Sequence, residues 1–188
     1  MNENLHQGGR LAEGAAAGKA QGVGPDASCG DFDMRIARDG TWYHEGAPIG
    51  RLPLVKLFST VLHKDENGEF WLITPVEKGR IEVEDAPFTA VELTVEGSGH
   101  AQTLSFRTNI DDIVTAGPDH PIRVAEDPAT GEPSPYILVR DRLEALILRP
   151  VFYHLVELGE EREVDGRRVL GVSSGGTFFA LGGLDEQS

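Results

Sequence analysis

Short runs of alternating apolar and charged residues, separated by turns that contain glycine, recur along this chain and constrain its fold more than any other feature. Ile81 and Val83 alternate with glutamates, and residues 91–95 repeat the pattern. Such alternation is typical of strands with one buried face. Further strands are predicted over 34–36, 42–43, 70–73, 104–106, 136–139, 145–148, 169–172 and 177–181, of which 145–148 could also be helical. The chain is therefore predicted to be rich in β-structure.

Two segments have helical rather than alternating periodicity, and each begins at a proline. The apolar residues that follow Pro53 are Leu54, Leu57, Phe58, Val61 and Leu62, and those that follow Pro150 are Val151, Phe152, Leu155, Val156 and Leu158. Proline favours the first turn of a helix, and Gly159 is a typical stop signal. The order strand, strand, Arg, helix, turn, strand thus occurs twice, near 34–73 and near 136–172. It indicates an internal duplication, although α+β proteins can share such an order by coincidence.

These elements predict an α+β fold with two β-rich halves, each containing one helix. Residues 29–88 form the predicted N-terminal α+β half, and residues 89–183 form a C-terminal β-rich half with one main helix. Residues 1–28 are rich in glycine and alanine and offer little apolar surface to bury. We expect them to form a flexible arm, because exposed terminal segments without apolar anchors rarely become ordered.

Composition excludes several classes of function. The chain has 17 Lys and Arg against 31 Asp and Glu, a net charge of −14, so nucleic acids and anionic membranes are poor partners. One cysteine excludes an internal disulfide and a multi-cysteine metal site, and no two histidines have the helical spacing of a metal pair. We expect no metal and no cofactor. Because no apolar run resembles a membrane span or a signal peptide, we expect a cytoplasmic protein.

One string resembles a catalytic motif. Residues 171–175 read Gly-Val-Ser-Ser-Gly, which matches the G-x-S-x-G nucleophile elbow of hydrolases. That elbow requires a helix directly after the serine and usually a later histidine. Here a strand is predicted over 177–181, and the last histidine is His154. We interpret the string as a glycine hairpin, and we predict no catalytic residue.

Two arginines are the strongest candidates for a binding site. Arg51 lies just before Pro53 and Arg149 just before Pro150, so both are expected at helix N-termini. A helix N-terminus favours anions, and a guanidinium group there adds charged hydrogen-bond donors. We hypothesise that one or both contact an anionic group of a ligand. The alternative is an ion pair with a local carboxylate, such as that of Glu45, Asp141 or Glu144.

Several stretches together resemble the bacterial family called domain of unknown function 1285. They are Asp31–Ile36, Asp39–Trp42, Pro48–Arg51, Leu54–Phe58, Thr74–Lys78, Val83–Phe88, Leu143–Leu146, Arg149 and Phe152–Val156. The resemblance implies two structurally similar halves, the second loosely like a pleckstrin-homology domain, with a ligand cleft between them. It also implies a nucleotide-like ligand and a signalling role. By the same resemblance the predicted cleft residues are Arg51, Thr74, Glu77, Lys78, Arg140, Glu144 and Arg149.

The function expected from the sequence is therefore a ligand-binding or sensing module for a small anionic molecule. Two alternatives remain open. A protein-interaction adaptor is one, because pleckstrin-like folds often bind peptides and fold alone does not decide function. An enzyme that draws acid and base groups from Glu77, Lys78 and Glu144 is the other, because catalytic residues need not be neighbours in sequence.

Overall fold

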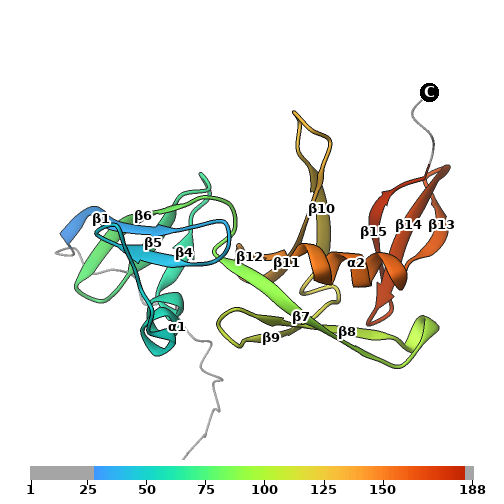
Figure 1. Cartoon of the computed structure of the whole chain (residues 1–188), viewed down its shortest axis with the longest axis horizontal. Helices are drawn as coiled ribbons and strands as arrows, with labels where there is room; N and C mark the ends of the chain where they lie inside the picture. Colours follow the sequence, from blue (N-terminus) through green and yellow to red (C-terminus); the bar gives the residue numbers. More distant parts are fainter. Residues whose placement is uncertain (1–27, 185–188) are drawn as a thin grey trace, which may run out of the picture.

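A computed structural model describes residues 28–184 of the chain, and two six-stranded sheets dominate it (Figure 1). The two sheets lie beside each other along the long axis of the molecule, and a third, three-stranded sheet lies at the C-terminal end. The predicted arm over residues 1–28 lies outside the described residues except for Ser28, where the first strand begins.

The N-terminal half contains six strands and one helix. Its strands are β1 (Ser28–Ile36), β2 (Trp42–His44), β3 (Ala47–Pro48), β4 (Leu62–Lys64), β5 (Phe70–Ile73) and β6 (Glu77–Val83). Helix α1 (Leu52–Thr60) connects β3 to β4 and carries Pro53 in its first turn, as predicted. The sheet order is β3-β2-β1-β6-β5-β4.

The C-terminal half contains nine strands and the second helix. Its strands are β7 (Phe88–Glu96), β8 (Thr103–Thr108), β9 (Ile113–Thr115), β10 (Ile122–Glu126), β11 (Pro133–Arg140), β12 (Leu143–Ile147), β13 (Glu160–Val164), β14 (Arg167–Ser174) and β15 (Thr177–Gly183). Helix α2 (Arg149–Glu157) follows β12, and a short 3₁₀ turn, η1 (Gly99–Ala101), precedes β8. The six-stranded sheet has the order β10-β11-β12-β7-β8-β9, and β13-β14-β15 form the smaller sheet.

The two six-stranded sheets have the same topology. Each consists of two antiparallel three-stranded meanders, joined at the centre of the sheet by one parallel pair, β1–β6 in the first sheet and β7–β12 in the second. The two sheets are therefore repeats of one arrangement, but the repeated segments are 28–83 and 88–147 rather than the predicted 34–73 and 136–172. The helices do not repeat with it, because α1 joins the two meanders of its sheet whereas α2 follows the last strand. The predicted α+β fold with two similar β-rich halves is confirmed.

The small sheet folds back onto the second six-stranded sheet. Strand β15 packs against β10, and β14 packs against β8, so this half curls around its own interior. Hydrogen bonds close the contact, because the backbone N–H of Leu104 donates to Ser174 Oγ at 2.9 Å and the side chain of Gln102 donates to the Ser173 carbonyl oxygen at 2.9 Å. This curled sheet is the part expected to resemble a pleckstrin-homology domain.

One hydrophobic core runs through both halves. Trp42 of β2 is buried and stacks on Phe58 of α1 with a ring separation of 6.2 Å, while Phe88, Phe106 and Leu155 are fully buried in the same cluster. The predicted apolar face of α1 is only partly correct. Leu54 and Leu57 are exposed, because this short helix buries only the narrow side that carries Val55 and Ser59. Leu62 is buried, but in β4 rather than in the helix.

Candidate functional site

The two helix-start arginines lie where the sequence predicts them, but their surroundings differ. Arg51 is the N-cap residue of α1 and Arg149 is the first residue of α2, and neither helix has a side-chain cap or an acidic residue in its first turn. Within residues 28–184, no ion pair or side-chain hydrogen bond of Arg51 is found. Arg149 Nη2 lies 3.8 Å from Glu132 Oε2, which is longer than a hydrogen bond, and both side chains are largely exposed.

The remaining predicted cleft residues do not gather around these arginines. Thr74 closes the turn between β5 and β6, where its Oγ1 accepts a hydrogen bond from the Glu77 backbone N–H at 3.0 Å. The Lys78 ammonium lies 4.1 Å from the centre of the Trp71 ring. Glu144 of β12 accepts two hydrogen bonds of 2.6 Å from the guanidinium group of Arg123 in β10, the outer strand of the same meander. The side chains of Thr74, Lys78 and Glu144 thus have local contacts, whereas Glu77 contacts Thr74 through its backbone, and a role in ligand binding remains a prediction for all four.

The G-x-S-x-G string is a glycine hairpin, as predicted. Ser174 pairs with Thr177 at the end of the β14–β15 ladder, and Gly175 and Gly176 form the turn with φ of 56° and 75°. The Ser174 hydroxyl is fully buried and donates to the Ala116 carbonyl oxygen at 2.8 Å, while it accepts from Leu104. The hydrogen bonds of Ser174 therefore hold the two sheets together. Ser173, the serine at the nucleophile position of the string, is also buried and donates its hydroxyl to Glu160 Oε1 at 2.9 Å, so the string presents no exposed nucleophile.

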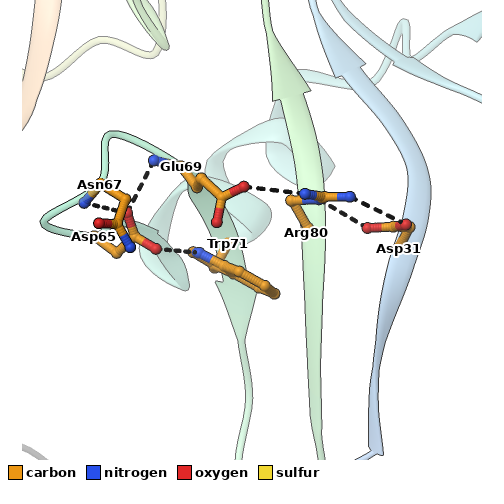
Figure 2. A network of polar contacts seen from close by, with 6 residues as sticks. All are labelled: Asp31, Asp65, Asn67, Glu69, Trp71 and Arg80. Atoms are coloured by element: carbon orange, nitrogen blue, oxygen red, sulfur yellow. Dashed lines mark hydrogen bonds and ion pairs between the residues drawn. The ribbon is translucent and has the colours of Figure 1, made fainter.

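A groove of about 540 Å³ runs along the first sheet between β1 and β6, and its polar wall is a network of paired charges (Figure 2). Arg80 lies between two carboxylates, with Nε 2.9 Å from Asp31 and Nη1 3.0 Å from Glu69. The other arginine of this groove, Arg35, is paired with Glu84 and stacks on Tyr43. Because both guanidinium groups are already neutralised, the groove offers little attraction for an anionic ligand.

The turn beside this groove is held by a single carboxylate. Asp65 accepts hydrogen bonds of 2.9 Å from the indole N–H of Trp71 and from the backbone N–H groups of Asn67 and Glu69 (Figure 2). The Trp71 hydrogen bond, followed by those from the backbone, lowers the pKa of Asp65 below its ordinary value of 3.8. Hydrogen bonds to an ionised carboxylate favour that form, so this network fixes the β4–β5 turn.

A second cavity, the inter-half cleft, has a volume of about 420 Å³ and lies between α1 and the β8–β9 loop. Its charges are also paired. Lys56 Nζ lies 2.8 Å from Asp111 Oδ2, and Arg140 Nη2 donates to the Ser59 carbonyl oxygen at 2.7 Å while Nη1 donates to Asp112 at 3.2 Å. These contacts join the C-terminal half to α1. Arg140 thus lies between the halves in contacts that hold them together, and its role in ligand binding remains a prediction.

A third cavity, the helix-start cavity, has a volume of about 430 Å³ and combines two arginine side chains with apolar walls. Arg149 and Phe152 of α2, Pro135 of β11 and Leu148 line it from the C-terminal half. Arg38, in the turn between β1 and β2, lines it from the N-terminal half. The cavity therefore lies where the two halves meet, and it is the cavity that contains one of the two predicted helix-start arginines.

The two guanidinium groups of this cavity keep free hydrogen-bond donors. Arg38 Nε lies 3.3 Å from Asp85 Oδ2, and within the described part of the chain its terminal nitrogens have no partner. Asp85 is itself held by the Tyr136 hydroxyl, which donates to it at 2.7 Å. Burial, and then this hydrogen bond, raises the pKa of Tyr136. No pattern in the sequence indicates Arg38 beyond its place directly before the Asp39-Gly40 turn.

Two kinds of feature are not found in residues 28–184. No group of three or more His, Cys, Asp or Glu side chains is arranged to hold a metal ion. Neither of the helices in this part of the chain has the length and apolar character needed to cross a membrane.

Comparisons with known proteins place both halves in one family. A model described as the N-terminal domain of DUF1285, a domain of unknown function, matches residues 24–86, and a model of the C-terminal domain matches residues 87–181. A crystal structure of a DUF1285 family protein from Silicibacter pomeroyi DSS-3 is 49% identical, with a TM-score of 0.76 over 88% of this chain and 91% of that one. One from Shewanella baltica OS155 is 27% identical, with a TM-score of 0.53 over 68% and 92%. No curated protein matches.

Proposed function

This chain belongs to the DUF1285 family, and we propose that it is a ligand-binding or sensing module that holds a small anionic molecule in the helix-start cavity. The observation that carries the proposal is the pair of guanidinium groups, Arg38 and Arg149, which face a cavity with apolar walls and retain unoccupied N–H donors. Guanidinium donors beside a helix N-terminus are a common means of holding carboxylates and phosphates.

The size and position of the cavity support the same proposal. A volume of about 430 Å³ falls within the range of small-molecule sites, which is roughly 300–1,000 Å³. Such sites commonly lie between domains and combine apolar walls with a few polar groups. Because one arginine comes from each half, a bound anion would bridge the halves, and its binding could be sensed as a change in how firmly they are joined.

A thermal-shift screen of the full chain with nucleotides, phosphates and carboxylates tests the proposal. A ligand present at 100 times its Kd stabilises the native state by about 2.7 kcal/mol, which raises the Tm of a protein of this size by roughly 5–10 °C. We expect Arg149→Ala and Arg38→Ala to weaken that shift. If no compound raises the Tm, the proposal is wrong.

Two other arginines provide matched comparisons. Arg167 is exposed at the start of β14 and lines none of the three cavities, so Arg167→Ala should leave the shift unchanged. Arg51 stands at a helix start like Arg149 but also lines none of them. If Arg51→Ala loses as much binding as Arg149→Ala, the ligand does not bind in this cavity alone, and the proposed position of the site is wrong.

A protein-interaction adaptor is the second candidate, and one observation favours it. Tyr153 and Val156 are exposed on the outer side of α2, beside the helix-start cavity, and could contact a peptide that continues out of it. Aromatic residues of this kind are enriched at interfaces. Val156 does not line the cavity, so a Val156→Ala variant that loses a co-purifying protein, while the Tm shift with small anions is retained, would support the adaptor.

A further inference from the structure

The walls and charges of the helix-start cavity restrict the chemistry of its ligand further. Resting on the proposed function, we infer that the ligand is a monoanion with an apolar body, a carboxylate on an acyl chain or an aromatic ring, rather than a nucleoside diphosphate or triphosphate. This narrows the nucleotide-like ligand that the family resemblance implies to a class with less charge and fewer polar groups.

The walls of the cavity are predominantly apolar. They are formed by Pro133, Pro135, Leu146, Leu148, Phe152 and Tyr153. Leu146 and Phe152 keep less than a tenth of their surface exposed, so packing against the rest of the protein holds these two walls in place. Removing apolar surface from water favours binding by roughly 25 cal/mol per Å², so an acyl chain or an aromatic ring gains affinity here.

The cavity offers few groups that could recognise a base or a sugar. Among its described lining residues, the neutral hydrogen-bonding side chains are the Ser134 hydroxyl and the Tyr153 phenol, and no asparagine, glutamine or aspartate is present. Sites that bind polar ligands use placed polar groups to fix orientation, and unpaired polar atoms on a buried ligand cost affinity. A nucleobase and a ribose would leave most of their polar atoms unpaired in this cavity.

The positive charge of the cavity is local and small. Arg149 faces Glu132, and Arg38 faces Asp85. Arg38 also acts on Asp127, whose pKa is lowered mainly by hydrogen bonds from Ala129 and Thr130 and slightly by the charge of Arg38. Two guanidinium groups therefore share their surroundings with three carboxylates, in a chain whose net charge is −14.

This balance selects against highly charged ligands. A phosphate chain with several negative charges would meet more carboxylates than guanidinium groups, and like charges close to one another repel. A single carboxylate requires only the unoccupied N–H donors of one or both arginines, which suit its planar geometry. The charge pattern and the apolar walls thus favour the same ligand class independently.

Isothermal titration calorimetry with the full chain tests the inference. The carboxylate probes are octanoate and 2-naphthoate. Their neutral counterparts, 1-octanol and 2-naphthamide, have the same apolar groups, and AMP and ATP are the nucleotide probes. We expect at least one carboxylate to bind about tenfold or more tightly than its neutral counterpart and than either nucleotide, as charged hydrogen bonds predict. NMR spectra of the labelled chain should show the largest amide shifts at Arg149–Tyr153 and near Arg38.

Two variants separate the contributions of charge and wall. Arg149→Ala should weaken the carboxylate about tenfold and leave the neutral compound unchanged. Tyr153→Ala removes an exposed part of the wall and should weaken both, while the fold is preserved because this side chain is 57% exposed. Carboxylate binding that Arg149→Ala leaves unchanged overturns the inference.

The outcomes distinguish this inference from the proposed function. If AMP or ATP binds in an Arg149-dependent way and the carboxylates do not, the proposed function stands and the inference is wrong. Equal binding of charged and neutral compounds also refutes the inference. If no probe in either class binds, both the inference and the proposed function fail.

Discussion

Arg140 provides the most informative test of how the two halves are joined. Its Nη2 donates to the Ser59 carbonyl oxygen at 2.7 Å, its Nη1 lies 3.2 Å from Asp112, and the guanidinium carbon lies 5.1 Å from the centre of the Phe88 ring. Arg140→Ala removes all three contacts. The variant should therefore lower the free energy of unfolding by more than an average surface substitution.

The size of the effect follows from these contacts. A hydrogen bond to a charged group contributes roughly 1.5–3 kcal/mol, and a cation–π contact about 0.5–1 kcal/mol. The ion pair with Asp112 adds little, because both side chains are partly exposed. We expect Arg140→Ala to lower the free energy of unfolding by about 2–4 kcal/mol and the Tm by roughly 5–12 °C.

Arg142→Ala is the matched control. Arg142 lies two residues further along the same β11–β12 hairpin and contacts Glu66 of the N-terminal half at 3.2 Å, but both of these side chains are mostly exposed. Its removal should cost less than about 0.5 kcal/mol. Urea unfolding followed by tryptophan fluorescence and by far-UV circular dichroism measures both variants. A loss in Arg140→Ala no larger than that in Arg142→Ala would refute the reasoning.

Three further predictions concern the network of Figure 2, the Tyr136 hydroxyl that holds Asp85, and the C-terminal hairpin. Asp65→Asn should lower the free energy of unfolding at neutral pH, because the wild-type carboxylate stabilises the fold only while it is ionised and its folded pKa is lowered. Urea titrations of both proteins should show the difference in free energy of unfolding shrink as the pH falls below 3.8, and a difference that persists at pH 2 would contradict the prediction. Folding raises the pKa of Tyr136, so the wild-type free energy of unfolding should fall as the pH rises above 10.0. Tyr136→Phe should remove one high-pH tyrosine ionisation from an ultraviolet absorbance titration, and an unchanged titration in this variant would show that the ionisation does not belong to Tyr136. Gly171→Ala should lower the free energy of unfolding by about 1–3 kcal/mol, because the new Cβ would lie 2.3 Å from Phe178 and 2.4 Å from the Phe179 carbonyl oxygen. Gly182→Ala is the control, because its new Cβ would have no atom within 4 Å, and equal Tm values for the two variants would disprove the steric argument.

Local signals in the sequence predicted the fold well. Pro53 and Pro150 marked both helices, because proline favours the first turn, and the glycines of residues 171–176 marked the last hairpin. Two of the strands that were missed lack such signals. Strand β13 is charged and almost wholly exposed, and β9 has three residues with one buried side chain, so neither shows a hydrophobic pattern.

The site was harder to predict because it depends on contacts between distant residues. Arg149 could be placed from its proline, whereas Arg38 reaches the cavity only because the first turn of one half meets the start of α2 in the other. Glu144 illustrates the converse. The family resemblance implied a cleft residue, but the β10–β11 hairpin brings Arg123 to Glu144, and the two form an ion pair. Pairings of this kind follow from the assembled sheets rather than from spacing along the chain.

The shared core has a consequence for anyone who wishes to divide this protein. The two family models meet between residues 86 and 87, and Phe88 directly follows that boundary with none of its surface exposed. A fragment that began at residue 87 would present this ring, and its neighbours in the core, to water. The boundary therefore separates the two family domains but passes through a single hydrophobic core. Because each piece alone would expose its part of that core, either piece expressed by itself should aggregate rather than fold.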